Sequence, residues 1–328
     1  VTVVVEGGFW KQRGRGRWLK DGDRDAKDFQ AVVAERRSRA ILHRLRGPTG
    51  AWVESEDLIG KEAIGFFQGL FTAEAPPSTY EFLNTIPRLV TDQDNSGLME
   101  PPTLEDVKKV IFSMDSESVV GPDGFTGEFF TFAWDVIAED VYQAVLSFFC
   151  GAELPRSITA TNIVLIPKVQ CPQDFTQYCL ISLCNFLNKV LSRILSDRLA
   201  KLLPRIISPQ QSGFVKGRQI ADNFLLAQEL VTDIGKPSRG GNMVVKLDMM
   251  KTYDRVSWYF LLQGMRRFGF SETWIDAIWR LVSNVWFSIL INGAPKGFFR
   301  STRGLRQGDP LSPALFVIGT EALSRALN

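Results

Sequence analysis

A single aspartate follows an apolar run of the chain, where its carboxylate could bind a metal ion. The run covers residues 243–247, and Asp248 comes directly after it. The carboxylate of Asp248 and the backbone carbonyl of Met249 are oxygen ligands of the kind that Mg²⁺ takes, with phosphate oxygens and water as its other ligands. Phosphoryl transfer by two metal ions needs more carboxylates at one place. Taken alone, Asp248 is more readily explained as a cap on the following turn.

An aromatic residue and a glycine-containing turn could complete a nucleotide site around Asp248. The ring of Tyr253 could pack flat under a sugar and crowd a 2′-hydroxyl, although an ordinary core tyrosine is the alternative. Gln307 and Gly308 lie about fifty residues further on. Glycine lets backbone N–H groups approach a phosphate, and the glutamine amide both donates and accepts hydrogen bonds. Arg306 could neutralise phosphate charge.

The same turn also has a purely structural interpretation. Asp309 and Pro310 have the residue types that begin helices, aspartate as the N-cap and proline at the first helical position. We therefore expect Asp309 to cap a helix over residues 310–327, whatever else the turn does.

Basic side chains are grouped in a way that suits contacts with a nucleic-acid backbone. Near the N-terminus they alternate with glycine between Trp10 and Trp18, a pattern favourable for phosphate contacts and base stacking. A basic amphipathic helix on the surface, over residues 26–46, explains this segment equally well. The candidate nucleic-acid contacts are Lys11, Arg13, Arg15, Arg17, Lys168, Lys216 and Arg218.

The net charge of +2 hides an uneven distribution along the 328 residues. Residues 1–46 hold 12 Lys/Arg against 6 Asp/Glu, residues 47–150 hold 4 against 18, and residues 151–328 hold 22 against 12. Two basic segments around an acidic one suit a chain that meets a polyanion, although solvated helix faces explain them as well. One histidine, and four cysteines without a Cys-x-x-Cys pair, argue against zinc sites and histidine-based chemistry.

Hydrophobic periodicity predicts an α+β fold. Strand patterns cover residues 163–168, 243–247 and 285–291, and Asn292-Gly293 is a hairpin turn that leads into a partner strand at residues 297–300. Thr103, with Asp106 three residues later, predicts a helix start. Further helices are expected up to Cys150 and over residues 186–203, 221–233 and 257–284, the last broken at Gly269. No run of eighteen apolar residues occurs, so we expect no membrane-spanning helix.

Taken together, these segments resemble the reverse transcriptase of plant non-long-terminal-repeat retrotransposons, the long interspersed element class. The matching motifs occur in the family's order from about residue 9 to the end of the chain. The most specific are the Asp248 stretch, residues 244–254, and the loop at residues 304–313. The others are residues 9–13, 18–23, 121–124, 161–168, 181–185, 211–218 and 292–293.

The resemblance implies a right-hand polymerase with fingers and a partial palm over residues 101–328. A basic and then acidic, mainly helical extension over residues 1–100 would precede them. It further implies RNA-directed DNA synthesis from deoxynucleotides with two Mg²⁺ ions, on an RNA template and a DNA primer, in the nucleus or cytoplasm. Asp248 would be the first metal ligand and Tyr253 the sugar-gating aromatic. Gln307 and Gly308 would line the pocket for the nucleotide and the template.

The chain departs from the family pattern at several positions. The family's paired aspartates, in an aromatic-Ala-Asp-Asp turn, would come after residue 328, so we expect a chain truncated within the palm that polymerises nothing alone. Cys179-Leu180 replaces a family-typical Arg-Pro, whose arginine is expected near the incoming triphosphate. Met250 and Thr252 replace small residues beside Asp248. Such departures are typical of a decaying copy of an element.

Three other interpretations stay open at the level of the sequence. The first is a non-catalytic nucleic-acid-binding remnant that uses its basic segments. The others are an RNA-binding relative of intron maturases and the product of a pseudogene with no role. Salt-dependent binding to an RNA–DNA hybrid would favour the first, because phosphate contacts release counterions.

Overall fold

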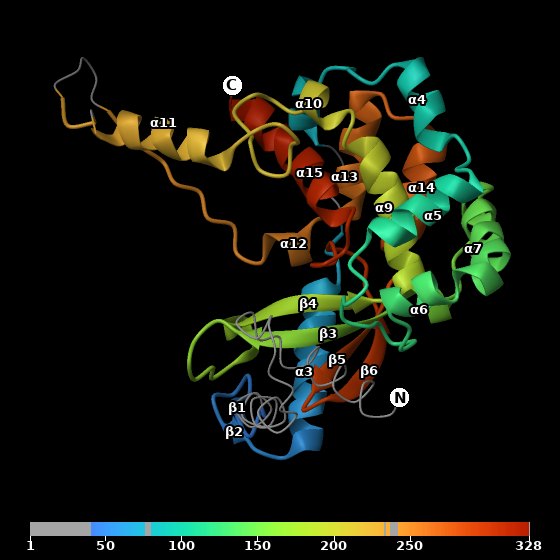
Figure 1. Cartoon of the computed structure of the whole chain (residues 1–328). Helices are drawn as coiled ribbons and strands as arrows, with labels where there is room; N and C mark the ends of the chain where they lie inside the picture. The colour runs from blue at the N-terminus through green and yellow to red at the C-terminus, as the bar shows by residue number, and fades with distance from the viewer. Residues whose placement is uncertain (1–40, 76–79, 233, 237–241, 328) are drawn as a thin grey trace, which may run out of the picture.

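A mixed β-sheet with one covering helix lies beside a layer of helices, and the chain passes between these two parts several times (Figure 1). The computed structural model describes residues 41–75, 80–232, 234–236 and 242–327. The arrangement confirms the predicted α+β fold class and is consistent with a fragment of polymerase fingers and palm.

The sheet has four strands in the order β4-β3-β5-β6. β3 (Ala160–Pro167) pairs antiparallel with β4 (Tyr178–Cys184) and parallel with β5 (Trp286–Ile291), and β5 pairs antiparallel with β6 (Ala294–Arg300). The β5–β6 turn is Asn292-Gly293, with φ angles of 50° and 85°. Two left-handed residues are what a two-residue type I′ hairpin turn requires. The strand predicted near residue 163 and the predicted hairpin are therefore confirmed.

β4 is a strand that the sequence periodicity did not identify. Tyr178, Leu180, Ser182 and Cys184 on one face are buried, and the alternate residues on the other face are half-buried. Because neither face of the strand is fully solvated, it lacks the apolar–polar alternation that marks a half-exposed strand.

One helix, α3 (Glu56–Phe71), packs on the sheet and forms the first hydrophobic core with it. Ile59 and Phe67 of α3 lie in this core with Ile163 of β3 and Phe287 of β5. A short ribbon of β1 (Leu45–Arg46) and β2 (Trp52–Val53) adds Leu45 to the same core. Residues 45–71 are thus an integral part of the sheet layer.

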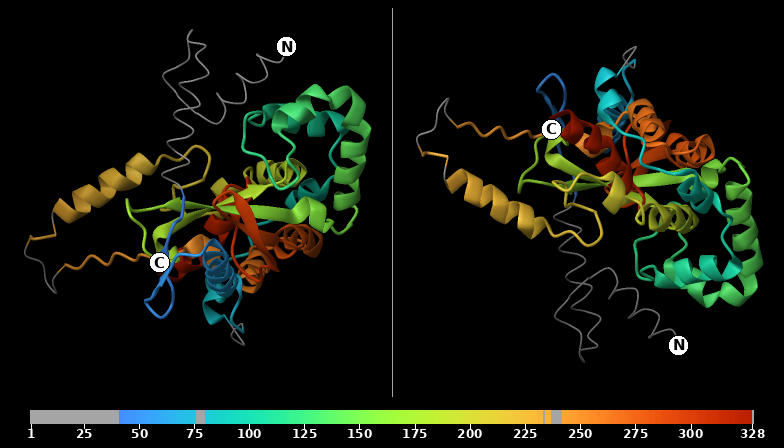
Figure 2. Two further views of the ribbon diagram at one scale, coloured as in Figure 1. Left: turned by 90° about the horizontal axis from the view of Figure 1, so that it is seen from below. Right: turned by 90° about the horizontal axis from the view of Figure 1, so that it is seen from above.

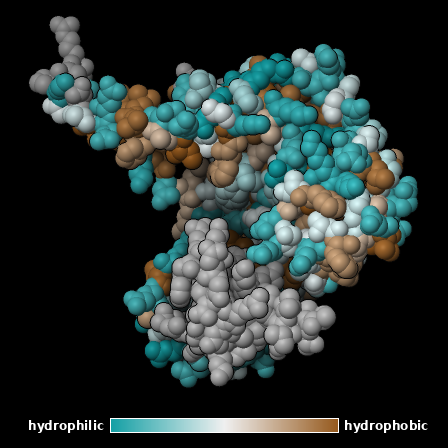
Figure 3. Space-filling view, in the orientation of Figure 1, coloured by the Kyte–Doolittle hydropathy of each residue, from teal (hydrophilic) through white to brown (hydrophobic). Residues whose placement is uncertain are grey.

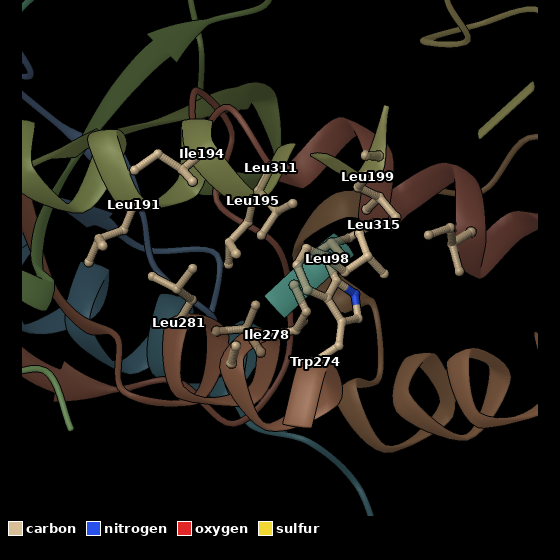
Figure 4. Packing of buried hydrophobic residues seen from close by; sticks show 14 of the residues in the cluster. Leu98, Leu191, Ile194, Leu195, Leu199, Trp274, Ile278, Leu281, Leu311 and Leu315 are labelled. Carbon is tan, nitrogen blue, oxygen red and sulfur yellow. The ribbon is translucent and has the colours of Figure 1, made fainter. Parts of the chain in front are cut away.

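The helical layer surrounds a second, larger core. Figure 4 shows Leu191 and Leu195 of α9 facing Leu281 and Ile278 of α14, with Trp274 and Leu315 beside them. Burial of each such side chain contributes about 1.5–3 kcal/mol to stability. The elements of this layer are η1 (Glu81–Thr85), α4 (Asp92–Met99), α5 (Leu104–Ser113), α6 (Gly127–Phe132), α7 (Trp134–Phe149), α8 (Arg156–Thr159), α9 (Phe186–Leu199), α10 (Leu203–Ile206), α13 (Trp258–Phe268), α14 (Glu272–Ser283) and α15 (Ser312–Leu327).

Local signals at the helix ends agree with several predictions. Thr103 Oγ1 accepts a hydrogen bond from Asp106 N at 3.1 Å, and Asp106 Oδ2 accepts one from Thr103 N at 3.0 Å, so the predicted capping box begins α5. Gly269, with φ of 97°, ends α13 and separates it from α14, as predicted. The helix predicted up to Cys150 is divided into α6 and α7 at Ala133, and the one predicted over residues 186–203 is α9 followed by α10.

The last helix begins later than predicted. α15 starts at Ser312, and the Asp309 carboxylate instead accepts a hydrogen bond from Leu311 N at 3.0 Å. Asp309 therefore closes the turn before the helix and is not its N-cap.

The helical core draws on residues on both sides of position 100, where the extension was expected to end. Residues 83–98 contribute to the helical core, which continues through Val107 and Ile111 of α5. Of the helix predicted over residues 26–46, residues 26–40 lie outside the described residues, and residues 41–46 are coil followed by β1. In the described part of the chain, no helix is both long and apolar enough to cross a membrane.

The strand predicted over residues 243–247 is wrong. This segment is extended coil, and Val244, Val245 and Leu247 are more than half exposed. A strand needs a neighbour to satisfy its backbone groups, and none of the described strands pairs with it. The preceding helix α11 (Ile220–Thr232) has no buried residue. Figure 2 shows α11 and the segment that returns from it standing away from the rest of the molecule.

Candidate functional site

The two motifs that the sequence singled out lie side by side in the structure. α12 (Thr252–Arg255) follows the Asp248 segment, and the 303–309 loop runs along it. Leu305 N donates to Tyr253 O, and Gly304 N donates to Val256 O, both at 2.8 Å. Gly304 has a φ of +93°, and a Cβ at this position would come within 2.7 Å of Asp254 O. Only glycine allows the two backbones to approach this closely.

Gln307 and Asp254 join the two motifs through their side chains. Gln307 Nε2 donates a hydrogen bond to Asp254 Oδ1 at 3.1 Å. Gln307 Oε1 accepts one from Cys179 Sγ at 3.5 Å, and the backbone O of Gln307 accepts one from Ser182 N of β4 at 2.8 Å. These bonds hold both ends of the Gln307 amide between α12 and β4.

Asp254 is a residue of this site that the sequence reasoning did not assign. The carboxylate is buried, and burial raises its pKa, although the hydrogen bond from Gln307 and three nearby cations oppose the rise. The cations are Lys168, Lys251 and Arg255. The only sequence signal for Asp254 was its position directly after Tyr253. The burial of its carboxylate depends on the close approach of the 303–309 loop, which the sequence does not reveal.

A pocket of about 450 Å³ opens between these elements and the start of α15. We call it the Tyr253–Gln307 pocket. The ring of Tyr253 stacks on Phe316 of α15, with centroids 4.4 Å apart and an interplanar angle of 15°. Burial raises the pKa of the Tyr253 hydroxyl. The lining residues are Phe214, Lys251, Thr252, Tyr253, Arg306, Gln307, Gly308, Ser312, Pro313 and Phe316.

Lys251 supplies positive charge at the edge of this pocket. Its backbone is left-handed, with φ of 51°, and its Nζ donates to Phe175 O at 3.3 Å and lies 4.8 Å from the centroid of the Phe66 ring. Burial lowers the pKa of the Lys251 ammonium. Phe175 belongs to η2 (Phe175–Gln177), at the start of β4. The ammonium is thus held against the sheet and beside Asp254.

Arg306 is directed into the protein and is largely used there. Its Nη2 forms an ion pair of 2.6 Å with Asp309 Oδ2, and both side chains are almost completely buried. Ser192 Oγ also donates to Asp309 Oδ2, at 3.0 Å. One donor, Arg306 Nη1, has no hydrogen-bond partner among the described residues. The structure uses Arg306 mainly for Asp309, and its role at a phosphate stays a prediction.

Asp248 and Met249, the predicted metal ligands, lie on the exposed segment before α12. The Met249 carbonyl accepts a hydrogen bond from Thr252 Oγ1, and the Met249 side chain lines a different pocket, of about 540 Å³, beside Phe260 and Phe316. No group of three or more metal-ligating side chains occurs within the described residues. A two-metal centre needs two or three carboxylates at one place. The described residues around Asp248 do not supply them.

The predicted nucleic-acid contacts have different environments. Lys168 and Lys216 are exposed at the surface. Arg218 instead donates to the backbone carbonyls of Pro204, Ile207, Ser208 and Gln211. Its guanidinium therefore closes the loop before α11, and a phosphate contact for Arg218 stays a prediction. Lys11, Arg13, Arg15 and Arg17 lie outside the described residues.

The chain is similar in sequence to known proteins. Residues 166–328 match the family model described as reverse transcriptase (RNA-dependent DNA polymerase). The chain is 27% identical, over 94% of its length, to the uncharacterized 149 kDa protein of transposon TX1 from Xenopus laevis. It is 26% identical, over 93% of its length, to the retrovirus-related Pol polyprotein of the type-2 retrotransposable element R2DM from Drosophila melanogaster.

These relatives are much longer than the chain, which spans 24% of the first and 28% of the second. A stretch of 43 residues, 13% of this chain, is 56% identical to an uncharacterized mitochondrial protein of Arabidopsis thaliana and covers 35% of that protein.

Proposed function

Because residues 166–328 match the reverse transcriptase family model, we propose that the Tyr253–Gln307 pocket receives the incoming deoxynucleotide during RNA-directed DNA synthesis. The observation that carries the proposal is the meeting of Tyr253, Gln307 and Gly308 in one pocket. They come from two motifs about fifty residues apart, which are joined by the bond between Gln307 and Asp254. The alternative for Tyr253, an ordinary core tyrosine, does not explain why its ring lines an open pocket.

Each lining residue has chemistry that suits a nucleotide and its template. The ring of Tyr253 offers a flat apolar surface at the sugar, where bulk opposes a 2′-hydroxyl. Gln307 has its amide held at both ends, so it presents fixed remaining hydrogen-bonding positions to a base or sugar. Gly308 lets the backbone come close to the nucleotide. A pre-organised pocket of this kind loses less entropy when a ligand binds.

Positive charge for the triphosphate comes from Lys251 and Lys168 in this proposal. Lys251 lines the pocket, and both lysines act on Asp254 electrostatically. Cys179, which contacts Gln307, occupies the place of the family's arginine, so the charge opposite the triphosphate is smaller than in the family pattern.

We further propose that Asp248 contributes one carboxylate to Mg²⁺ binding and that the substrates are an RNA template, a DNA primer and dNTPs. The support is the reverse transcriptase match and the place of Asp248 just before α12. The similarity to the Arabidopsis protein over 43 residues supports a plant element as the source. Asp248 alone does not fit two metal ions, so no catalytic step is assigned to it.

The test measures binding, which does not depend on turnover. The purified 328-residue chain is titrated with a fluorescent dATP in the presence of an RNA–DNA primer–template and Mg²⁺. We expect Gln307→Ala to weaken dATP binding about tenfold and Tyr253→Ala to reduce the preference for dATP over ATP. Gln143→Ala, on the exposed side of α7, is the matched control.

Thermal unfolding of each variant separates loss of the pocket from loss of the fold. Equal dATP affinity in the unchanged chain and in a folded Gln307→Ala variant would contradict the proposal. Primer–template binding without any dATP binding would favour the alternative of a non-catalytic nucleic-acid-binding remnant.

A further inference from the structure

The helices α6 and α7 expose a row of apolar side chains that the reverse transcriptase function does not use. The rings of Phe125 and Phe129 are in tilted contact, with centroids 4.6 Å apart and an interplanar angle of 34°. Phe132 is 92% exposed, and Val136 is 85% exposed. Phe129 and Phe132 lie one turn apart on α6, and Val136 lies in the first turn of α7, just after the break at Ala133. We call these four residues the aromatic face.

The aromatic face is surrounded by carboxylates. Residues 101–150 hold nine Asp/Glu and two Lys. Glu128 lies one helical turn before Phe132, and Asp135 and Asp140 lie a turn after Phe132 and Val136. None of these three forms an ion pair with another described residue. Figure 3 shows brown and teal residues intermixed over the region of α6 and α7.

The support beneath the aromatic face is rigid. Phe130 of α6 is buried and stacks on Phe186 of α9, with centroids 4.7 Å apart. A Cβ at Gly127 would lie 2.9 Å from the Phe186 ring and 3.0 Å from Ser116 Cα. The preceding turn is fixed as well, because Asn185 Oδ1 accepts a hydrogen bond from Asp123 N at 3.2 Å. Exposed phenylalanines on a rigid support lose little entropy on binding a partner.

We propose that the aromatic face binds a basic, amphipathic polypeptide segment. Contiguous exposed apolar side chains mark interaction sites, and the carboxylates around them fix the sign of the partner's charge. A nucleic acid is unfavourable here because its phosphates meet carboxylates. A second copy of the same face is also unfavourable, since a two-fold contact places Glu128 and Asp135 opposite like charges.

The experiment uses the 328-residue chain and a synthetic helical peptide of leucine and lysine as the probe, followed by fluorescence anisotropy. Phe132→Ser combined with Val136→Ser removes the exposed apolar groups without touching the core. Leu225→Ser with Leu230→Ser, on exposed positions of α11, is the matched control. Asp135→Asn with Asp140→Asn tests the charge.

We expect the Phe132 and Val136 double variant to bind the probe at least tenfold more weakly and the α11 variant to bind it unchanged. The Asp135 and Asp140 double variant should lose several-fold in affinity, with a weaker salt dependence. Equal losses in the α11 variant, or equal binding of a serine–lysine peptide of the same charge, would overturn the proposal. So would single-stranded RNA that competes for this face, or a dimer that Phe132→Ser dissociates.

Discussion

The buried ion pair between Arg306 and Asp309 gives a sharp test of the structure, because the sequence suggested a different task for Arg306. In the structure the two side chains are 6% and 3% exposed, and their closest atoms are 2.6 Å apart. Replacing Arg306 by methionine keeps most of the side-chain volume but leaves the Asp309 carboxylate buried without a cation. Removing one partner of a buried pair costs about 3–5 kcal/mol.

Local hydrogen bonds set the expected size of the effect. Asp309 keeps the bonds from Ser192 Oγ and Leu311 N, each 3.0 Å long, after Arg306 is removed. We therefore expect Arg306→Met to lower the free energy of unfolding by about 3 kcal/mol, the lower end of the range for a buried pair, or roughly a 150-fold shift in the folding equilibrium. The double variant Arg306→Met with Asp309→Asn removes both charges, and its loss should be at least about 1.5 kcal/mol smaller.

Urea unfolding followed by circular dichroism measures these differences, with Arg193→Met as the control. Arg193 is paired at 3.0 Å with Asp197, and both side chains are about half exposed, so this ion pair contributes only about 0–1 kcal/mol. A loss below 1 kcal/mol for Arg306→Met would refute the buried pair. If that variant kept its stability but lost dATP affinity, Arg306 would be a phosphate contact, as the sequence suggested.

Three further predictions concern the loop and its neighbours. Gly304→Ala should destabilise the chain by about 2–4 kcal/mol in urea unfolding, because Gly304 has a φ of +93° and an added Cβ would meet the Asp254 carbonyl. The control Gly50→Ala, also at positive φ but in open space, should cost only about 1 kcal/mol. Equal losses of stability in the two variants would argue against the close approach of the loop to Asp254. Asp254→Asn should alter the pH dependence of thermal unfolding: burial raises the pKa of Asp254, so the wild-type contribution is most favourable below the ordinary carboxyl value and is lost as pH rises through the raised pKa. The variant should therefore gain stability relative to wild type as pH rises above the ordinary carboxyl value, and a constant difference would refute the burial. Cys179→Arg should strengthen dATP binding several-fold at low salt by restoring a cation beside Gln307, whereas Cys171→Arg, at an exposed cysteine away from the pocket, should leave it unchanged.

The parts of the fold that the sequence predicted are those determined by short-range chemistry. Asn292-Gly293 makes a hairpin in any compatible surroundings, and Thr103 with Asp106 caps a helix through bonds within one turn. The order of motifs also predicted that Tyr253 and Gln307 meet. These features depend on residues close in sequence or on a family pattern.

What sequence reasoning missed depends on the distant surroundings of each residue. Residues 243–247 have a strand pattern, but pairing requires a neighbour that the described sheet does not provide. The buried ion pair of Arg306 with Asp309 could not be predicted from the residue types alone. Arg218 looks like a free cation, yet four carbonyls of its own loop surround it.

The chain crosses several times between the sheet layer and the helical layer, and this limits how the protein can fold and whether either layer can be produced alone. Residues 45–71 complete the sheet, residues 83–149 enter the helical core, and the chain then returns to the sheet for β3 and β4 before α9. β5 joins β3 in parallel although about 120 residues separate them. Neither layer is therefore an independent folding unit, because its parts become available only after most of the chain is made. Contacts of such long range slow folding, and expression of either layer alone should give an insoluble product.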